Sequence, residues 1–204
     1  MWRKLFTALA AVVALAGCSG DSSGPGDGTA RVTLLLTDAP GDIKTAMVTI
    51  DEIYLQGGDG GRVVLMDEPV TTDLLTLVDD YQALLTDVEV PAGDYSQLRF
   101  VISGAYIEVE REGGATEFFA SASDYPGLPG GAVVTGLLKM PSFNSSGLKV
   151  NFPGSLTLEE GETTLLVDFD VAQSFGKEAG QSGKWVMHPV ITGEKTEAPP
   201  PAAP

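Results

Sequence analysis

The chain has 204 residues, with 28 acidic and 12 basic side chains and a formal net charge of −16 at pH 7. A surface with this much negative charge repels phosphate backbones and anionic head groups. This disfavours nucleic-acid binding and electrostatic docking to a membrane. Cationic partners and divalent metal ions remain compatible with this charge, as does the simpler role of keeping an exported domain soluble.

The first 18 residues have the organisation of a bacterial lipoprotein export signal. Arg3 and Lys4 precede an apolar stretch over residues 5–16, and the run Leu15-Ala16-Gly17-Cys18 ends it. The apolar stretch is shorter than the about 20 helical residues that cross a hydrocarbon core, so a lasting transmembrane helix is not expected. We predict that residues 1–17 are a cleaved signal peptide and that the Cys18 thiol carries a lipid that holds the chain to the membrane. A plain secretory signal with an incidental cysteine is the alternative.

The residues after the signal predict how the mature chain is held. Ser19 follows Cys18, and because aspartate at that position usually retains lipoproteins at the inner membrane, an outer-membrane location is favoured in a cell that has one. Residues 18–29 are mostly Gly, Ser, Asp and Pro and are expected to form a flexible tether. Cys18 is the only cysteine, so no internal disulfide is expected. Arg3 and Lys4 leave with the signal, so 10 of the 12 basic residues remain against 28 acidic ones, a formal charge of −18.

The first elements after the tether are predicted to be strands. Residues 31–37 follow a period of two and end at a turn over residues 38–42. Residues 46–56 and 62–66 are rich in β-forming side chains and are separated by four glycines and an aspartate, which predicts a hairpin. Apolar residues at helical spacing within residues 72–85 predict one short helix.

The rest of the chain adds further short strands. Residues 97–109 predict a long apolar strand at the centre of a sheet, or two strands broken at Gly104. Other β-like runs cover residues 116–120, 133–139, 148–152, 163–175 and 185–191. This pattern favours an all-β fold over a parallel α/β fold. We predict a single mostly β domain over residues 30–194, an antiparallel β-sandwich of the immunoglobulin-like or transthyretin-like kind with one short helix, and a disordered Pro/Ala tail over residues 195–204.

Four segments in a fixed order carry a resemblance to a known family. They are Leu36-Thr37-Asp38-Ala39-Pro40, Pro91-Ala92-Gly93-Asp94-Tyr95-Ser96-Gln97-Leu98-Arg99, Val167-Asp168-Phe169-Asp170-Val171-Ala172-Gln173-Ser174 and His188-Pro189-Val190-Ile191. The combination resembles the uncharacterised prokaryotic lipoprotein domain known as domain of unknown function 4382, over about residues 29–193. The resemblance implies a β-sandwich-like exported domain on a lipid anchor and implies no activity. The Pro91–Tyr95 stretch is interpreted as structural, because proline and glycine shape a turn and a tyrosine hydroxyl can bond to the backbone.

Four aspartates are candidate calcium ligands. Asp38 and Asp42 flank a turn, and Asp168 and Asp170 alternate on a late strand, so that their carboxylates share one face. Calcium prefers six to eight carboxylate or carbonyl oxygens, and a cation would relieve the repulsion between two such carboxylates. The glycine-bearing calcium loop is absent, however, and aspartates in turns commonly accept backbone hydrogen bonds. The alternative is therefore a structural turn and a solvated face.

Several aromatic residues are candidates for a ligand surface. Phe118 and Phe119 place one ring on each face of a strand, and Tyr125 and Trp185 lie near glycine-rich segments. Sugars and apolar peptides often lie against such rings. Packing of these rings in the core is the alternative.

Catalytic machinery is not evident. His188 is the sole histidine and is followed directly by Pro189, and the predicted folded part contains no Gly-x-Ser-x-Gly elbow for a serine nucleophile. We therefore expect a non-enzymatic binding or interaction module of the cell envelope, with a protein, peptide or glycan as ligand, no cofactor and no nucleic-acid partner. An envelope hydrolase that uses paired carboxylates and a calcium-stabilised assembly module are the alternatives.

Overall fold

The structure is a computed structural model of the chain. It describes residues 28–39, 43–58, 60–77, 81–111, 113–140, 146–175, 178 and 183–196. The predicted signal peptide, Cys18, residues 19–27 of the tether, Asp42 and the end of the tail at 197–204 lie outside the described residues. No helix within the described part of the chain is long and apolar enough to cross a membrane.

The smaller of two sheets has four strands within the described residues, in the order β13–β11–β1–β5. β1 (Thr29–Ala39) lies between β11 (Gly161–Asp170), which runs parallel to it, and β5 (Gln82–Pro91), which runs antiparallel to it. β13 (Ile191–Thr196) pairs with β11 at one edge of the sheet. The last strand extends to Thr196, two residues beyond the predicted end of the domain.

The larger sheet is built on β2 (Ile43–Gly57) and β6 (Gly93–Glu110), which pair antiparallel. β3 (Arg62–Met66) and β4 (Val70–Asp73) pair with β2, and β7 (Thr116–Ala120), β8 (Val134–Lys139) and β12 (Lys184–Val186) follow on the other side of β6. Two short strands, β9 (Leu148–Val150) and β10 (Leu156–Leu158), also pair with β6. β6 is therefore an interior strand, as the sequence predicts for residues 97–109, and it continues through Gly104 without a break.

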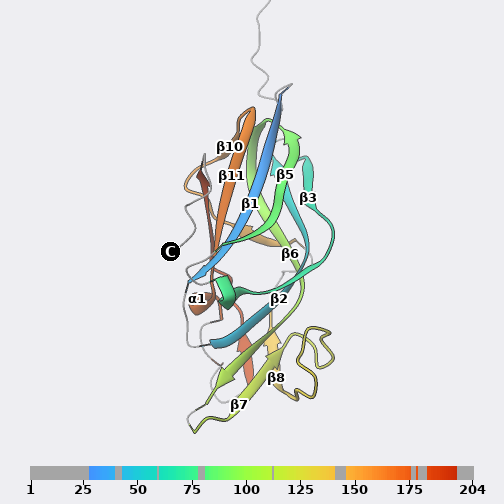
Figure 1. Cartoon of the computed structure of the whole chain (residues 1–204), viewed down its shortest axis with the longest axis vertical. Coiled ribbons are helices and arrows are strands. Elements are labelled where there is room, and N and C mark those ends of the chain that lie inside the picture. The colour runs from blue at the N-terminus through green and yellow to red at the C-terminus, as the bar shows by residue number, and fades with distance from the viewer. Residues whose placement is uncertain are drawn as a thin grey trace, which may run out of the picture.

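The core lies between the two sheets because alternate residues of their strands are apolar. Val32, Leu34 and Leu36 of β1 are buried, and so are Phe100 and Ile102 of β6. These side chains belong to one hydrophobic cluster, in which each buried large side chain stabilises the fold by about 2 kcal/mol. Figure 1 shows β1, β5 and β11 in front of β6, with β7 and β8 at the end of the elongated molecule opposite to the start of β1.

The prediction of a mostly β, sandwich-like fold is confirmed: 67% of the described residues lie in strands, and these residues include one α-helix. The sheets are mixed, however, because β1–β11, β7–β8 and β8–β12 are parallel pairs. Turn signals reveal only how consecutive strands are joined, and parallel partners must be linked by long connections. β1 and β11 are separated by most of the described chain, so no local signal reports their pairing.

The predicted helix within residues 72–85 is wrong in its extent. Leu74–Leu77 form a short 3-10 helix, η1, and residues from Gln82 onward belong to β5. Leu84 and Leu85 pack against the core as strand residues, so tertiary contacts override their helical spacing.

The predicted strand over residues 163–175 is also corrected. β11 ends at Asp170, and the α-helix α1 (Val171–Phe175) follows. The Asp170 Oδ1 atom accepts a hydrogen bond from the backbone N–H of Gln173 at 2.8 Å. This is the bond that an aspartate makes at the start of a helix, and it explains why the strand stops here.

The Pro91–Tyr95 turn has the structural role expected from its sequence. Gly93 has a φ of 149°, and the ring of Tyr95 is 4% exposed. The Tyr95 hydroxyl donates a hydrogen bond to the Pro91 carbonyl oxygen at 2.6 Å. The tyrosine therefore closes the turn from β5 into β6.

Candidate functional site

The parallel pairing of β1 with β11 brings two of the family-like segments together. In this register Thr37 lies beside Asp168, Asp38 beside Phe169 and Ala39 beside Asp170. The antiparallel partner on the other side of Asp168 is Thr192 of β13. Three of the four predicted calcium ligands thus belong to one end of the smaller sheet, and the fourth, Asp42, lies outside the described residues.

A groove of about 750 Å³ lies at this end of the sheet. It is on the outer face, because the alternate residues Val167 and Phe169 point into the core. Phe152 forms one wall and packs so tightly on Gly193 that a Cβ atom at position 193 would overlap its ring. The full set of lining residues is Thr37, Tyr81, Asn151, Phe152, Pro153, Leu166, Asp168, Thr192, Gly193 and Glu194.

Asp168 is the electrostatically strained group of the groove. Its Oδ1 atom is buried and has no hydrogen-bond partner among the described residues. The nearby Thr37 hydroxyl does not donate to it, because that hydroxyl donates to the Leu77 carbonyl oxygen at 3.2 Å. Burial, and then the negative charge of Asp170, raise the pKa of the Asp168 carboxyl above its usual 3.8.

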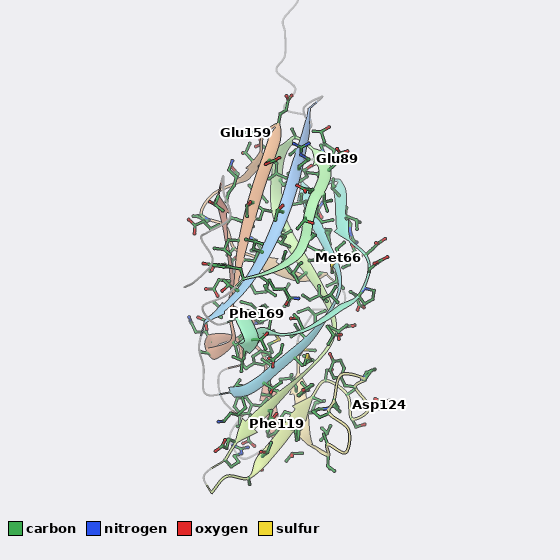
Figure 2. The ribbon with its side chains drawn as sticks, viewed as in Figure 1. Met66, Glu89, Phe119, Asp124, Glu159 and Phe169 are labelled. Atoms are coloured by element: carbon green, nitrogen blue, oxygen red, sulfur yellow. The ribbon has the colours of Figure 1, made fainter. Side chains whose placement is uncertain are left out.

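Asp170 has a different role although it shares a sheet face with Asp168. Both of its carboxylate oxygens accept hydrogen bonds from Gln173, one from the backbone N–H and one from the side-chain amide. Asp170 is thus engaged by α1, whereas Asp168 lines the groove. In Figure 2 the label of Phe169, the residue between them, lies near the middle of the molecule.

We predict that Asp168→Asn stabilises the protein at neutral pH and that this gain vanishes in acid. A raised folded-state pKa means that the folded protein binds this proton more tightly than the unfolded chain does. The penalty is therefore fully present above the raised pKa and is lost as the pH falls through it towards 3.8. Asparagine has no charge to bury, so we expect a gain at neutral pH, which solvent screening of this partly exposed carboxylate keeps below about 1 kcal/mol. Urea unfolding of both proteins across a pH series measures the difference, and a gain that does not change with pH would contradict this assignment.

The described residues do not assemble a metal site. Among them, no group of three or more His, Cys, Asp or Glu side chains lies close enough together to hold a metal ion. Calcium binding by Asp38, Asp42, Asp168 and Asp170 stays a prediction, since Asp42 and the side chain of Asp38 lie outside the described set.

The four predicted ligand-surface aromatics divide between two clusters. Phe119 and Trp185 are 1% and 6% exposed, and their ring centroids lie 5.6 Å apart in the main core. Phe118 and Tyr125 pack with Tyr106 in a smaller cluster. Tyr125 also lines a second cavity, on the outer face of the larger sheet.

The groove contains residues that sequence reasoning missed. Asn151, Phe152 and Glu194 belong to no motif. They join the groove because Asn151, directly after β9, bridges to Thr192 of β13, and β13 pairs with β11. His188 is exposed and does not line the groove, whose described lining residues include no His, Cys, Lys or Arg.

Comparison with known proteins places the chain in a family. The model of a domain of unknown function (DUF4382) matches residues 29–189, which include β1, β11 and most of the groove. Neither the curated proteins nor the solved structures give a match. The matched region covers more than half of the chain, so the protein belongs to the DUF4382 family of domains of unknown function.

Proposed function

We propose that this chain is a lipid-anchored, non-enzymatic binding module of the cell envelope that holds its ligand in the groove on the outer face of the smaller sheet. The observation that carries this proposal is Asp168, a carboxylate with a raised pKa and a buried, unpartnered oxygen that lines the groove. Such a group destabilises the folded protein, and residues that do so cluster at functional sites. A ligand that brings a hydrogen-bond donor or a positive charge would relieve this strain.

The other lining residues favour a peptide or glycan segment. Asp168 and Glu194 supply carboxylate acceptors, Asn151 supplies an amide, and Phe152 supplies an apolar ring. Because the described lining includes no basic side chain, an anionic ligand would meet only repulsion there. The ligand class that fits is a peptide with a basic side chain or a glycan that donates hydrogen bonds.

The position of the groove is consistent with a membrane anchor. β1 begins at Thr29, the last residue of the predicted tether, and Thr37 of the groove lies eight residues further along the strand. At a rise of about 3.3 Å per residue, this carries the groove about 26 Å from the tether. A chain held by Cys18 would therefore keep the groove apart from the point of attachment, whichever way the flexible tether orients the domain.

A hydrolase that uses paired carboxylates is the second candidate. The raised pKa of Asp168 is a property that a general acid needs, and it favours this alternative. Glu194 would supply the second carboxylate of such a pair, and the experiment below distinguishes the two candidates.

The test is retention of ligands by the mature chain on arrays of peptides and glycans. Ligands that the wild type retains should bind Asp168→Asn about tenfold more weakly, through loss of a charge-assisted hydrogen bond. Glu162→Gln is the matched control, since Glu162 is an exposed acid on β11 outside the groove, paired with Arg31 at 3.2 Å. Equal retention by wild type and Asp168→Asn would exclude the groove as the binding site. Cleavage of a bound glycan that Asp168→Asn abolishes would favour the hydrolase.

A further inference from the structure

The second cavity, of about 640 Å³, lies on the outer face of the larger sheet, and five of its nine lining residues carry a hydroxyl group. Its floor is formed by β2, β4 and β6, and one wall is the segment 121–127 that follows β7. The hydroxyls belong to Thr49, Thr71, Ser103, Ser121 and Tyr125. In Figure 2, Asp124 of this wall lies in the loop beside β8, well apart from the label of Phe169.

Two strand irregularities shape the floor. Between the pairs Thr49–Gly104 and Ile50–Ile102, β6 has one extra residue, Ser103. At the next irregularity β2 has one extra residue, Asp51. Bulges of this kind re-aim side chains and are frequent beside functional sites.

The bulged residues contact one another. The Ser103 hydroxyl donates to the Asp51 Oδ1 atom at 2.6 Å. Because the Ser103 hydroxyl uses its one hydrogen to donate to the carboxylate, the lone pairs of its oxygen are left to accept a hydrogen bond from a ligand.

The wall is held in one position by Tyr125. This residue is 7% exposed, and Cβ atoms built on Gly104 and on Gly127 would each lie 2.5 Å from its ring. The Tyr125 hydroxyl lies 2.5 Å from the Thr49 Oγ1 atom, which lies 2.8 Å from the Thr71 Oγ1 atom. The chain of hydroxyls is therefore ordered before any ligand arrives, which lowers the entropy lost on binding.

We propose that this cavity is a second binding site and that its ligand is a neutral saccharide. Hydroxyl groups both donate and accept hydrogen bonds, which matches the alternating donors and acceptors of a polyol. The described lining adds the carboxylate of Asp124 and includes no lysine or arginine, so phosphorylated and uronic acid ligands are repelled. Pro126 and Ala122 offer apolar surface for the C–H face of a sugar ring. The site is separate from the groove at Asp168 and does not depend on the function proposed for that groove.

The test is an NMR titration of the mature chain with three neutral disaccharides, cellobiose, maltose and diacetylchitobiose, and with cellobiuronic acid as an acidic counterpart. At least one neutral disaccharide is expected to bind and to shift the resonances of residues 121–127. Ser103→Ala should weaken this binding about tenfold, because it removes a hydroxyl oxygen that accepts a hydrogen bond from the saccharide. Ser103 is exposed, so the protein should still fold. Cellobiuronic acid should bind more weakly than cellobiose, and Asp168→Asn should leave the affinity for neutral disaccharides unchanged.

The matched control is Thr157→Val. The Thr157 hydroxyl also donates to an aspartate, Asp94, at 2.6 Å, but it does not line the cavity. This variant should bind as the wild type does, and melting temperatures without saccharide check that both variants are folded. Failure of all three neutral disaccharides to bind overturns the proposal. Equal affinity of wild type and Ser103→Ala, or stronger binding of cellobiuronic acid than of cellobiose, also overturns it.

Discussion

Replacing Cys18 with alanine is expected to abolish lipid attachment and to release the protein from the membrane fraction completely. The thiol is the nucleophile that becomes the thioether, and alanine has no group that can take its place. Each buried acyl methylene contributes about 0.8 kcal/mol, so several chains hold the protein stably and their loss leaves only a very acidic chain with no affinity for anionic head groups. Metabolic labelling with an alkynyl fatty acid, followed by fractionation of the cells, measures both effects.

The control for this experiment is Ser19→Asp, which keeps the thiol next to the cleavage point. This variant should still carry the lipid, and in a cell with two membranes it should move to the inner one. A wild-type protein whose mass shows an unmodified thiol at residue 18 would contradict the lipoprotein prediction.

Replacing Gly136 with alanine is expected to destabilise the folded protein by about 3 kcal/mol, because it overfills a closed position. Gly136 lies in β8 beside Phe119 of β7. A Cβ atom there would overlap the carbonyl oxygen of Gly183 and would lie 2.9 Å from the Phe119 ring. Gly183 directly precedes β12, so the new methyl group forces this strand away from β8. Urea unfolding measures the loss of stability.

Trp185 is a fluorescent probe of the contact between β8 and β12. It lies in β12 with its ring against Phe119, and it is the single tryptophan once Trp2 leaves with the predicted signal. Its fluorescence in Gly136→Ala should therefore shift towards that of an exposed indole.

The matched control is Gly130→Ala, at a position where a Cβ atom would meet nothing within 4 Å. Its stability should stay within about 0.5 kcal/mol of the wild type. Equal stability of the two alanine variants would contradict the close packing of β12 on β8.

The two aspartates of β11 show which parts of the site can be predicted from the sequence. Asp168 and Asp170 were predictable as a pair on one sheet face, because a strand has a period of two. Their division of roles was not predictable, since it depends on α1 engaging Asp170 and on the groove that Asp168 lines. The aromatic residues show the same limit. Alternation places Phe118 and Phe119 on opposite faces of the strand. The sequence does not show that Trp185 packs against Phe119 and buries it in the core.

The amino-acid sequence alone determined the local features of this protein: its many short strands, the long interior strand β6, the turn closed by Tyr95, and the predicted signal that ends at Cys18. These features depend on neighbouring residues, through side-chain alternation and the backbone preferences of proline and glycine. The tertiary structure decided that β1 pairs in parallel with β11, and that Thr37, Asn151, Asp168 and Glu194 line one groove. Contacts between such distant segments are selected by the free energy of burying the whole core, which no short stretch of sequence carries.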